Sequence, residues 1–347
     1  MLILEQDLEA VLERTRPLWE ELKGGRLFIT GGTGFFGRWL LETFAHANGR
    51  LHLGSEIVVL TRDPESFRRR APALTAATGI HLHHGDVASF KWPDGPFTHV
   101  IHAASELSVA RPKDPIGLVE ATLAGTRRVL ELARSSGAKK FLFTSSGAVY
   151  GPMFPGRGKV SEGDLLSALP LEARGAYAEA KRLAELVTCI FGKEHGIEIK
   201  IARGFAFVGP FLPLDSHLAA AGFLRSVLAG EPIRILGHGQ TVRSYLYGAD
   251  LATWLWTILF KGRAEQPYNL GSDVPVTIEE LARAVSSARA PGVEVQVLGR
   301  LQERETVDVY LPDLTKARSE LGVEIFTPLP EAIQRTLLFH SQDHQNR

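Results

Sequence analysis

The sequence has one cysteine among 347 residues, no surplus of either charge and no apolar run long enough to cross a membrane. Cys189 cannot form a disulfide within the chain, and the acidic residues among positions 4–22 exclude a secretory or transit peptide. The 39 basic residues balance 39 acidic ones, which excludes a global attraction to nucleic acid or to an anionic membrane. The most apolar run, residues 251–260, is about half as long as a membrane span of ~20 residues. We therefore expect a cytoplasmic protein with no nucleic-acid or membrane partner.

Hydrophobic residues make up 44% of the chain and charged residues 22%, which excludes disorder and is typical of a folded protein. From Gly25 onward, short apolar or β-branched runs alternate with stretches of helical spacing. Because consecutive parallel strands need a crossover long enough to be helical, this alternation predicts an α/β fold with a doubly wound parallel sheet of the Rossmann type. The predicted strands are residues 27–30, 56–61, 80–83, 99–102, 140–144 and 197–202, and the predicted helices are 35–47, 116–135 and 175–194.

The rhythm of strand and helix breaks after Gly209-Pro210, so we divide the chain into three parts. Residues 1–24 form a helical extension with a polar face, an appendage that precedes the main fold. Residues 25–209 form the sheet domain. Residues 210–347 form mainly a smaller α/β lobe, and we leave open that segments of it return to the sheet. The predicted strands of this lobe are 233–236 and 293–298 and its predicted helices are 250–260, 278–287 and 329–339, with Trp254 and Trp256 at the core and rim of the first helix.

A glycine-rich turn joins the first predicted strand to the first predicted helix, at residues 30–37. Gly31 permits a tight exit from the strand, Gly34 lets the backbone approach a pyrophosphate, and Gly37 lets the helix pack closely on the sheet. The N-terminus of that helix offers unpaired N–H groups and a positive dipole end to a phosphate. A glycine-rich turn can exist without a ligand, but its position at the start of a βαβ unit favours a dinucleotide-binding domain. The smaller lobe would then bind the substrate.

Tyr177 and Lys181 are four residues apart on a predicted helix, so their side chains face the same way. An isolated tyrosine hydroxyl has a pKa of about 10, and a neighbouring ammonium favours its phenolate form. Such a hydroxyl can exchange a proton with a substrate alcohol. An isolated pair of this kind is more often a surface pair, but its occurrence after the glycine turn favours a catalytic role.

The order of these and further motifs resembles that of the extended short-chain dehydrogenases/reductases. The matching segments are the TGxxGxxG spacing at residues 30–37, Gly85-Asp86-Val87 near the adenine, residues 101–105 under the nicotinamide ribose, residues 143–151, Tyr177 with Lys181, and residues 203–210. This branch comprises nucleotide-sugar epimerases, dehydratases and reductases. The resemblance therefore implies a nucleotide-diphosphate sugar as substrate and NADP or NAD as cofactor. It also implies a homodimer in which helices 116–135 and 175–194 pair with those of a second subunit.

The resemblance assigns roles to particular residues. Ser146, Tyr177 and Lys181 would be catalytic, with Ser145 as the alternative to Ser146. Tyr177 exchanges the proton, Lys181 holds the cofactor ribose and Ser146 aligns the reacting oxygen. The substrate contacts would be Ser146, Arg203 and Arg243, since the planar fork of an arginine suits two adjacent phosphates. The cofactor contacts would be Thr30, Gly31, Gly32, Thr33, Gly34, Phe35, Phe36, Gly37, Arg62, Asp63, Asp86, Val87, Ala103, Ala104, Ser105, Thr144, Ser145, Tyr177 and Lys181.

Two departures from the family pattern bear on the reaction. Members that dehydrate or decarboxylate sugars carry one or two acidic residues where this chain has Gly147 and Ala148. Ala206 replaces an asparagine that commonly contacts the sugar or its diphosphate. We therefore expect an NAD(P)-dependent epimerase that transfers hydride at a sugar carbon, with C4 favoured, through a keto-sugar intermediate. The alternatives are an NADPH-dependent keto-sugar 4-reductase, a 4,6-dehydratase or decarboxylase, and a nicotinamide-binding regulator without turnover.

The choice between the two nicotinamide cofactors depends on the end of the second predicted strand. Thr61 stands where NAD-using relatives carry an acidic residue for the ribose 2′-OH. Arg62 can accommodate a 2′-phosphate, so the sequence slightly favours NADP. If the strand ends one or two residues later, Asp63 can bind the ribose 2′-OH, so NAD remains the alternative.

Four histidines, His81, His83, His84 and His217, bear on the question of a metal or substrate site. His81, His83 and His84 do not predict a metal site, because alternation along a strand separates His84 from the other two and no Cys or acidic partner completes a ligand set. His217 begins the substrate loop of the family pattern, but a solvated loop position is the favoured interpretation.

Overall fold

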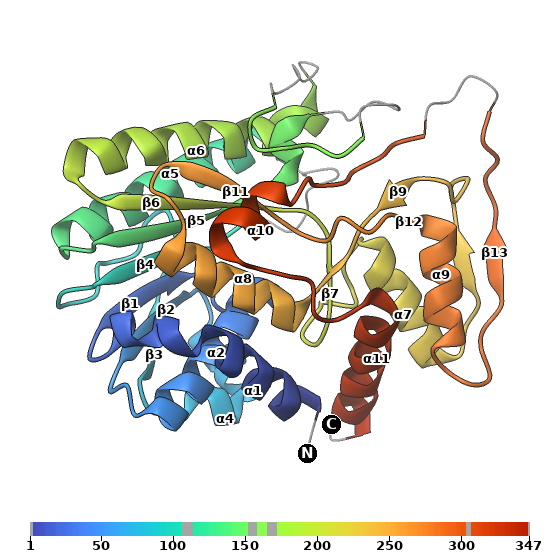
Figure 1. Ribbon diagram of the computed structural model, residues 1–347, viewed down its shortest axis with the longest axis horizontal. Helices are drawn as coiled ribbons and strands as arrows, with labels where there is room; N and C mark the ends of the chain where they lie inside the picture. Colours follow the sequence, from blue (N-terminus) through green and yellow to red (C-terminus); the bar gives the residue numbers. More distant parts are fainter. Residues whose placement is uncertain (1–2, 106–113, 152–157, 165–171, 303–306, 346–347) are drawn as a thin grey trace.

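In the computed structural model, residues 3–105, 114–151, 158–164, 172–302 and 307–345 are described (Figure 1). Seven parallel strands form the central sheet, in the order β11-β6-β5-β4-β1-β2-β3. The strand order reverses between β1 and β4, and ligands of doubly wound folds bind beyond the carboxyl ends of the strands at this point. The α/β fold with a doubly wound parallel sheet is confirmed. The strands are β1 (Arg26–Thr30), β2 (Glu56–Thr61), β3 (Ile80–His84), β4 (His99–His102), β5 (Lys140–Ser146), β6 (Glu198–Gly204) and β11 (Gln266–Leu270).

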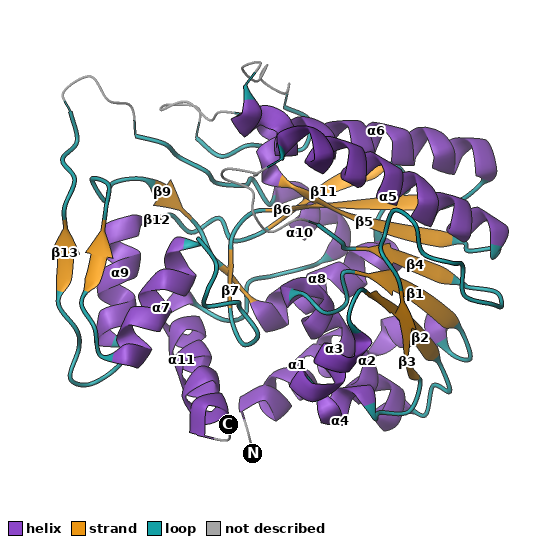
Figure 2. Ribbon diagram, turned by 180° about the vertical axis from the view of Figure 1, so that it is seen from behind, coloured by secondary structure: helices purple, strands orange, loops and turns teal. Residues whose placement is uncertain are grey.

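Helices cover both faces of the sheet (Figures 1 and 2). One face carries α5 (Pro115–Ser135) and α6 (Ala176–His195), which pack against each other. The other face carries α2 (Phe35–Leu51) and α8 (Gly248–Lys261), with α1 (Ile3–Thr15) packed on both of them. Because both faces are buried, the strands are apolar on both sides. Phe28 belongs to the core under α5 and α6, whereas Leu27 and Ile29 belong to the core on the opposite face.

The edge strand β11 comes from the C-terminal part of the chain and pairs with β6. The sequence predicts the other six strands but not this one, because its five residues include a proline and two polar residues. Pro267 is tolerated since an edge strand makes ladder bonds on one side only. A segment of the C-terminal part therefore returns to the sheet, the option that the sequence left open.

The N-terminal segment belongs to the main core. At Pro17, α1 gives way to a 3₁₀ helix, η1 (Arg16–Leu22), instead of continuing to residue 22. Val11 and Trp19 are fully buried in the largest hydrophobic cluster, and the Trp19 ring lies 4.7 Å from the ring of Trp256 on α8. The predicted N-terminal helix is confirmed over Ile3–Thr15, but the expectation that this segment is an appendage to the fold is wrong.

The smaller lobe lies beside the sheet, as Figure 2 shows. Its helices α7 (Ala219–Ala229), α9 (Ile278–Ser287) and α11 (Leu329–Gln345) pack together with the parallel pair β8 (Ile233–Ile235) and β13 (Val295–Val297). Two further strand pairs are β7 (Phe207–Val208) with β10 (Leu246–Tyr247) and β9 (Val242–Arg243) with β12 (Val276–Thr277). Short helices complete the described chain: α3 (Pro64–Arg70), α4 (Pro72–Thr75), η2 (Gly147–Tyr150), η3 (Ala173–Gly175) and α10 (Thr315–Leu321).

Helix α8 is buried from Gly248 to Phe260. Trp254 and Trp256 are both fully buried, so the expectation that one of them lies at the rim is wrong. Their indole N–H groups are satisfied by the Glu324 carbonyl at 3.0 Å and the Thr43 hydroxyl at 2.9 Å. Within the described residues, no helix is both long enough and apolar enough to span a bilayer.

Candidate active site

The glycine-rich turn lies between β1 and α2, at the carboxyl edge of the sheet. Gly31 has a φ of +71°, and a Cβ at this position would clash with the backbone of Ala103 in the loop after β4. A Cβ on Gly37 would clash with the backbone of Gly31 and Gly32. A Cβ on Gly34 would meet only the Gly31 carbonyl, at 3.5 Å, so the start of α2 is open to a ligand. This open, dipole-bearing N-terminus fits a pyrophosphate.

Aromatic packing connects the glycine turn to the smaller lobe. Phe35 and Phe36 form the first residues of α2, and the Phe36 ring meets the Phe207 ring of β7 edge to face at 4.8 Å. Phe207 precedes the Gly209-Pro210 step into the smaller lobe. The predicted cofactor contacts in the turn thus lie at the junction of the two parts.

The predicted contacts on the adenosine side follow β2 and β3. The side chain of Arg62 is exposed directly after β2. Asp63 is the N-cap of α3, and its carboxylate accepts a hydrogen bond from the N–H three residues later at 2.8 Å. The carboxylate of Asp86 is similarly engaged, because it accepts the N–H two residues later at 2.9 Å. Val87 lies next to Gly125 of α5.

The loop after β4 is held against the glycine turn by Thr30. The N–H of Ala103 donates to the Thr30 carbonyl at 3.1 Å, and the N–H of Ala104 donates to the Thr30 hydroxyl at 3.2 Å. Ser105, the next residue, is exposed. Thr30 therefore fixes the relative position of two of the predicted cofactor-binding segments.

Tyr177 and Lys181 lie one turn apart at the start of α6. The Lys181 Nζ lies 5.9 Å from the centroid of the Tyr177 ring and 4.9 Å from that of Phe143. It donates a hydrogen bond to the Thr144 carbonyl at 3.0 Å. Burial lowers the pKa of Lys181, and the neighbouring Tyr177 opposes this shift. The tyrosine is partly exposed, so a ligand has access to it.

Ser146 ends β5, two residues after the Thr144 carbonyl that Lys181 binds. Its hydroxyl oxygen accepts the N–H of Ala148 at 3.1 Å, and it is hydrogen-bonded to the hydroxyl of Tyr310. Burial raises the pKa of Tyr310, and the nearby Tyr177 raises it further. Tyr310 is therefore hydrogen-bonded to Ser146 and lies close enough to Tyr177 to feel its charge. The hydroxyl of Ser145 is buried and has no partner in the described part of the chain.

Tyr310 is a site residue that the sequence does not predict. Its ring lies 4.7 Å from the ring of Phe205 and its hydroxyl fills the space beside Gly147. A Cβ at position 147 would clash with this hydroxyl and would lie 2.9 Å from Phe205. The one signal in the sequence is Gly147 itself, since a missing side chain leaves room for a group from elsewhere.

Arg243 lies on β9, beside Tyr310. Its guanidinium is 5.5 Å from the centroid of the Tyr310 ring and forms an ion pair with Asp308. The guanidinium also donates to the Val242 carbonyl at 2.8 Å. Its side chain is 26% exposed, so part of its donor fork remains accessible to an anion.

Arg203 has a different environment from the one predicted. Its guanidinium forms a two-pronged ion pair with Glu185 on α6, and its Nη1 donates to the Tyr150 hydroxyl at 3.0 Å. Both partners of the ion pair are buried. Although burial alone would lower the pKa of Arg203, the hydrogen bond and charge of Glu185 raise it. Because its donors are engaged inside the protein, we withdraw Arg203 from the substrate contacts.

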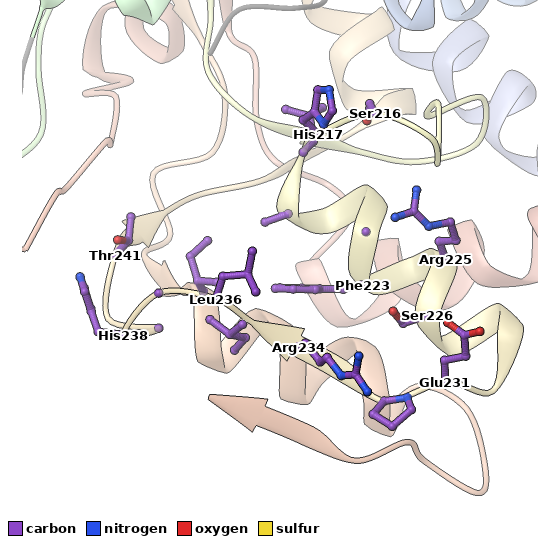
Figure 3. Close-up of a pocket in the computed structure, with 18 residues that line it drawn as sticks. Ser216, His217, Phe223, Arg225, Ser226, Glu231, Arg234, Leu236, His238 and Thr241 are labelled. Atoms are coloured by element: carbon purple, nitrogen blue, oxygen red, sulfur yellow. The ribbon is translucent and has the colours of Figure 1, made fainter. Parts of the chain in front are cut away.

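The smaller lobe contains a cleft of about 910 Å³ between α7 and β8 (Figure 3). Phe223 and Leu236 contribute apolar surface, and Arg225 and Arg234 contribute positive charge. The cleft extends to Thr241, two residues before Arg243. Its remaining lining residues are Ser216, His217, Leu218, Ala219, Gly222, Ser226, Glu231, Pro232, Ile235, Gly237, His238, Gly239 and Ile278.

Two of the three histidines of β3 have partners of their own. His81 lies 3.8 Å from the Glu56 carboxylate, and His83 is hydrogen-bonded to the Lys91 carbonyl at 2.6 Å. Across the described ranges, no group of three or more His, Cys, Asp or Glu residues is arranged to hold a metal ion. His217 is exposed and borders the cleft.

Known proteins share this sequence pattern and fold. A family model described as "NAD dependent epimerase/dehydratase family" matches residues 27–271. The chain is 27% identical over 324 residues to UDP-glucuronic acid decarboxylase 1 of Xenopus tropicalis, a match that covers 93% of this chain and 73% of that protein. Its fold is similar to UDP-glucose 4-epimerase from Thermotoga maritima with UDP-glucose (TM-score 0.76, 20% identity, 92% and 99% of the two chains). UDP-glucuronic acid 4-epimerase from Bacillus cereus, in complex with UDP-glucuronic acid and NAD, is as similar (TM-score 0.76, 20% identity, 91% and 99%).

Proposed function

Because the chain belongs to the NAD dependent epimerase/dehydratase family, we propose that it is a nucleotide-sugar 4-epimerase that acts through a keto-sugar intermediate. The observation that carries this proposal is the grouping of Ser146, Tyr177 and Lys181 at the carboxyl edge of the sheet, in the part of the fold that also holds the glycine turn. An epimerase of this kind needs one proton carrier beside one hydride carrier. The described side chains offer one such proton carrier, Tyr177, in a partly open position.

The cradle for a dinucleotide would be built from the glycine turn, the loop at residues 103–105 and Lys181. The open space at Gly34 and the N-terminus of α2 suit the pyrophosphate. The Lys181 ammonium has two N–H groups besides the one that binds Thr144, and these can donate to a ribose. When bound, the nicotinamide supplies the site that accepts hydride from the sugar carbon and returns it.

Tyr177 would carry the proton. Its hydroxyl would take the proton of the reacting sugar hydroxyl during oxidation and return it during reduction. The Lys181 ammonium would stabilise the negative charge that develops on the Tyr177 oxygen, and its burial limits screening by water. Ser146 would hydrogen-bond the same sugar oxygen and so align it with Tyr177. These three side chains would thus complete the proton path.

The arrangement of the smaller lobe supports a nucleotide sugar as the substrate. Arg243 lies between the Tyr310 side of the site and the cleft that begins at Thr241. A sugar at Tyr177 would place its diphosphate near Arg243, whose planar fork suits two phosphates. The nucleoside would then extend into the cleft along β8. This order of groups corresponds to the order of parts in a nucleotide-diphosphate sugar.

The site favours epimerisation over decarboxylation or dehydration, although eight curated relatives, 27–30% identical to this chain, are UDP-glucuronic acid decarboxylases. Those reactions move additional protons and need a further acid or base near the sugar. Residues 147 and 148 are glycine and alanine, and Tyr310 fills the space beside Gly147. Because the Tyr310 hydroxyl occupies the space beside Gly147, a carboxylate side chain at position 147 would have no room.

A keto-sugar 4-reductase is the second candidate, and Arg62 is the observation that favours it. The exposed Arg62 at the end of β2 suits a 2′-phosphate, and the Asp63 carboxylate is already engaged in capping α3. We therefore propose NADP in preference to NAD. Mass spectrometry of the purified protein separates the two reactions, because an epimerase retains its cofactor through turnover whereas a reductase releases it. If the protein is purified with a nicotinamide cofactor bound, the result favours the epimerase. If it is purified without one, the result favours the reductase.

Substitution Tyr177→Phe tests the proposed function. Removal of the hydroxyl should lower kcat by about 10²-fold or more, because it removes the proposed proton carrier. Affinity for NADH or NADPH should change little, since the ring is retained. Tyr268→Phe removes a hydroxyl that binds Glu320 on α10 and is the matched control. Unchanged turnover in Tyr177→Phe, or no turnover of any UDP-sugar by the wild type, would contradict the proposal.

We also propose that the chain forms a homodimer through α5 and α6. Three apolar side chains of α6, Leu183, Leu186 and Ile190, are between 43% and 56% exposed along one stripe. A groove of about 520 Å³ between the two helices carries charges of both signs, including Arg134 and Glu194. An apolar stripe flanked by both charges can face a rotated copy of itself in a two-fold interface.

A further inference from the structure

His102, the last residue of β4, is a buried histidine that the proposed proton path does not use. It is 3% exposed, and its Nδ1 lies 2.7 Å from the hydroxyl of Thr30. Its Nε2 lies 3.2 Å from the hydroxyl of Thr126 on α5. The rings of Phe141 and Phe143 lie 6.3 and 5.6 Å away and restrict the orientation of the imidazole. Both ring nitrogens are therefore engaged in a dry, aromatic environment.

The neighbouring hydrogen bonds determine which nitrogen carries the proton. Thr126 donates its hydroxyl proton to the Thr122 carbonyl at 2.7 Å, so its oxygen can only accept the proton of Nε2. In a neutral imidazole Nδ1 then accepts, and its donor is the hydroxyl of Thr30. The Thr30 oxygen in turn accepts the N–H of Ala104 at 3.2 Å. The hydrogen bonds thus run in one direction, from the loop after β4 through His102 to α5.

The surroundings keep this imidazole neutral. Burial, and to a smaller extent the charge of Lys181, lower the pKa of His102 to about 3. A charged imidazolium would donate from both nitrogens, and the Thr30 hydroxyl would lose its acceptor. The chain of bonds ends at the carbonyl of Thr122, which has no proton to pass on. The chain therefore fixes geometry and does not conduct protons.

The segments that His102 fixes are those predicted to hold the pyrophosphate and the nicotinamide ribose of the cofactor. Thr30 binds the loop at residues 103–105 through two hydrogen bonds, and Gly31 lies against Ala103. The backbone of His102 is also tied in, because its carbonyl accepts the Thr144 hydroxyl at 3.3 Å. The Thr144 carbonyl accepts Lys181. One residue thus connects the glycine turn, the loop and the lysine of the site.

We propose that His102 is a positioning residue for the bound dinucleotide, an inference that rests on the proposed function. As a neutral imidazole with its proton on Nε2, it holds the Thr30 hydroxyl. Thr30 holds the loop after β4, and this loop and the glycine turn form the two walls of the cradle. Loss of the hydrogen bond between His102 and Thr30 would free the loop after β4 to move and would weaken binding of NADH and NADPH.

The test compares His102→Asn with His102→Gln. Asparagine places an oxygen near the position of Nδ1, so it keeps an acceptor for Thr30. Glutamine resembles histidine more closely in volume but places its amide near the position of Nε2. Binding of NADH and NADPH is followed by nicotinamide fluorescence, and thermal unfolding is measured without cofactor. For the coenzyme that the wild type binds better, we expect Kd to rise less than about threefold in His102→Asn and about tenfold or more in His102→Gln.

The control is Thr122→Val, which removes a hydroxyl one turn from Thr126 on α5 that binds the Leu118 carbonyl and not His102. It should leave Kd unchanged. If His102→Gln binds the coenzyme as well as His102→Asn, the role is packing and the inference is overturned. Should either variant fail to fold, Thr30→Val and Thr30→Ser test the same bond, and equal affinities in those two would overturn it. A wild type that binds neither coenzyme overturns the proposed function, whereas these variant results overturn the inference alone.

Discussion

The ion pair of Glu185 and Arg203 illustrates how single residues support the site without touching a ligand. Glu185 follows Lys181 by one turn of α6, and Arg203 lies on β6 beneath that helix. The Arg203 guanidinium also binds the Tyr150 hydroxyl, which donates to Asn269 on β11 at 2.7 Å. This buried network therefore ties the helix that carries the catalytic pair to the sheet.

Substitution Glu185→Gln should be strongly destabilising. It leaves the Arg203 charge buried without its counter-ion, which costs about 3 kcal/mol or more of the free energy of unfolding. Glu65→Gln removes half of an exposed ion pair with Arg68 and should cost less than about 1 kcal/mol. Urea denaturation of both variants measures the difference. Similar small losses in the two variants would show that Arg203 finds another partner.

Arg243 is expected to act on substrate binding more than on the chemical step. In Arg243→Gln, KM for the nucleotide sugar should rise by about tenfold or more, as for the loss of a charge-assisted hydrogen bond, with a smaller change in kcat. Arg283→Gln, which breaks an ion pair with Glu279 on α9, is the control. A fall in kcat with KM unchanged would place Arg243 near the reacting carbon instead.

The residues of the site differ in how far the sequence can predict them. Tyr177 and Lys181 are predictable because their spacing is local and the helix brings them to one face. Tyr310 is not, because its contact with Ser146 depends on how a segment of the smaller lobe folds back over β5. Arg203 has the expected position in the sequence, but its burial against Glu185 depends on side-chain packing that no short motif encodes.

At the scale of elements, the first turn of α2 depends on close backbone contact. A Cβ at Gly37 would clash with the glycine turn, whereas a Cβ at Gly49, near the other end of the same helix, meets nothing. The two positions share one helix and differ in the space around them. Only the first of them bears on the cofactor cradle.

The substitution Gly37→Ala should therefore weaken binding of NADH and NADPH by about tenfold or more. The added Cβ would clash with the backbone of Gly31 and Gly32, so the glycine turn would have to shift. The matched change Gly49→Ala should leave binding unchanged and stabilise the fold by up to about 1 kcal/mol, since alanine favours a helix. Fluorescence titration and thermal unfolding measure the two effects. Equal cofactor binding in both variants would argue against the turn as the phosphate site.

Elements were predictable where the pattern of apolar residues is local. The strands from β1 to β6 and the long helices α2, α5 and α6 follow from alternation of apolar runs with helical spacing, whereas the short helices α3 and α4 are not predicted. Strand β11 does not, because Pro267 and its polar neighbours are acceptable only at an edge that the sequence does not reveal. The burial of Trp19 likewise depends on a distant element, since its ring packs on Trp256 of α8.

At the scale of the whole molecule, the proposed homodimer predicts a particle of twice the 38.0 kDa chain mass. Leu186→Glu places a charge in the centre of the apolar stripe on α6 and should yield a monomer. Leu338→Glu, at a similarly exposed position of α11, should leave the dimer intact. Light scattering of the purified variants measures the mass. A wild type that runs as a monomer would remove this proposal and leave the catalytic one in place.

The return of β11 to the sheet has a consequence for how the polypeptide can be divided. The sheet receives its seventh strand only after the chain has left it, built part of the smaller lobe and laid α8 across one face. A fragment that stops at residue 209 would leave β6 unpaired on the side where β11 lies, and the apolar sheet face under α8 would be uncovered. Because the C-terminal part supplies β11 and α8 to the sheet domain, neither lobe can be excised or exchanged as a self-contained module.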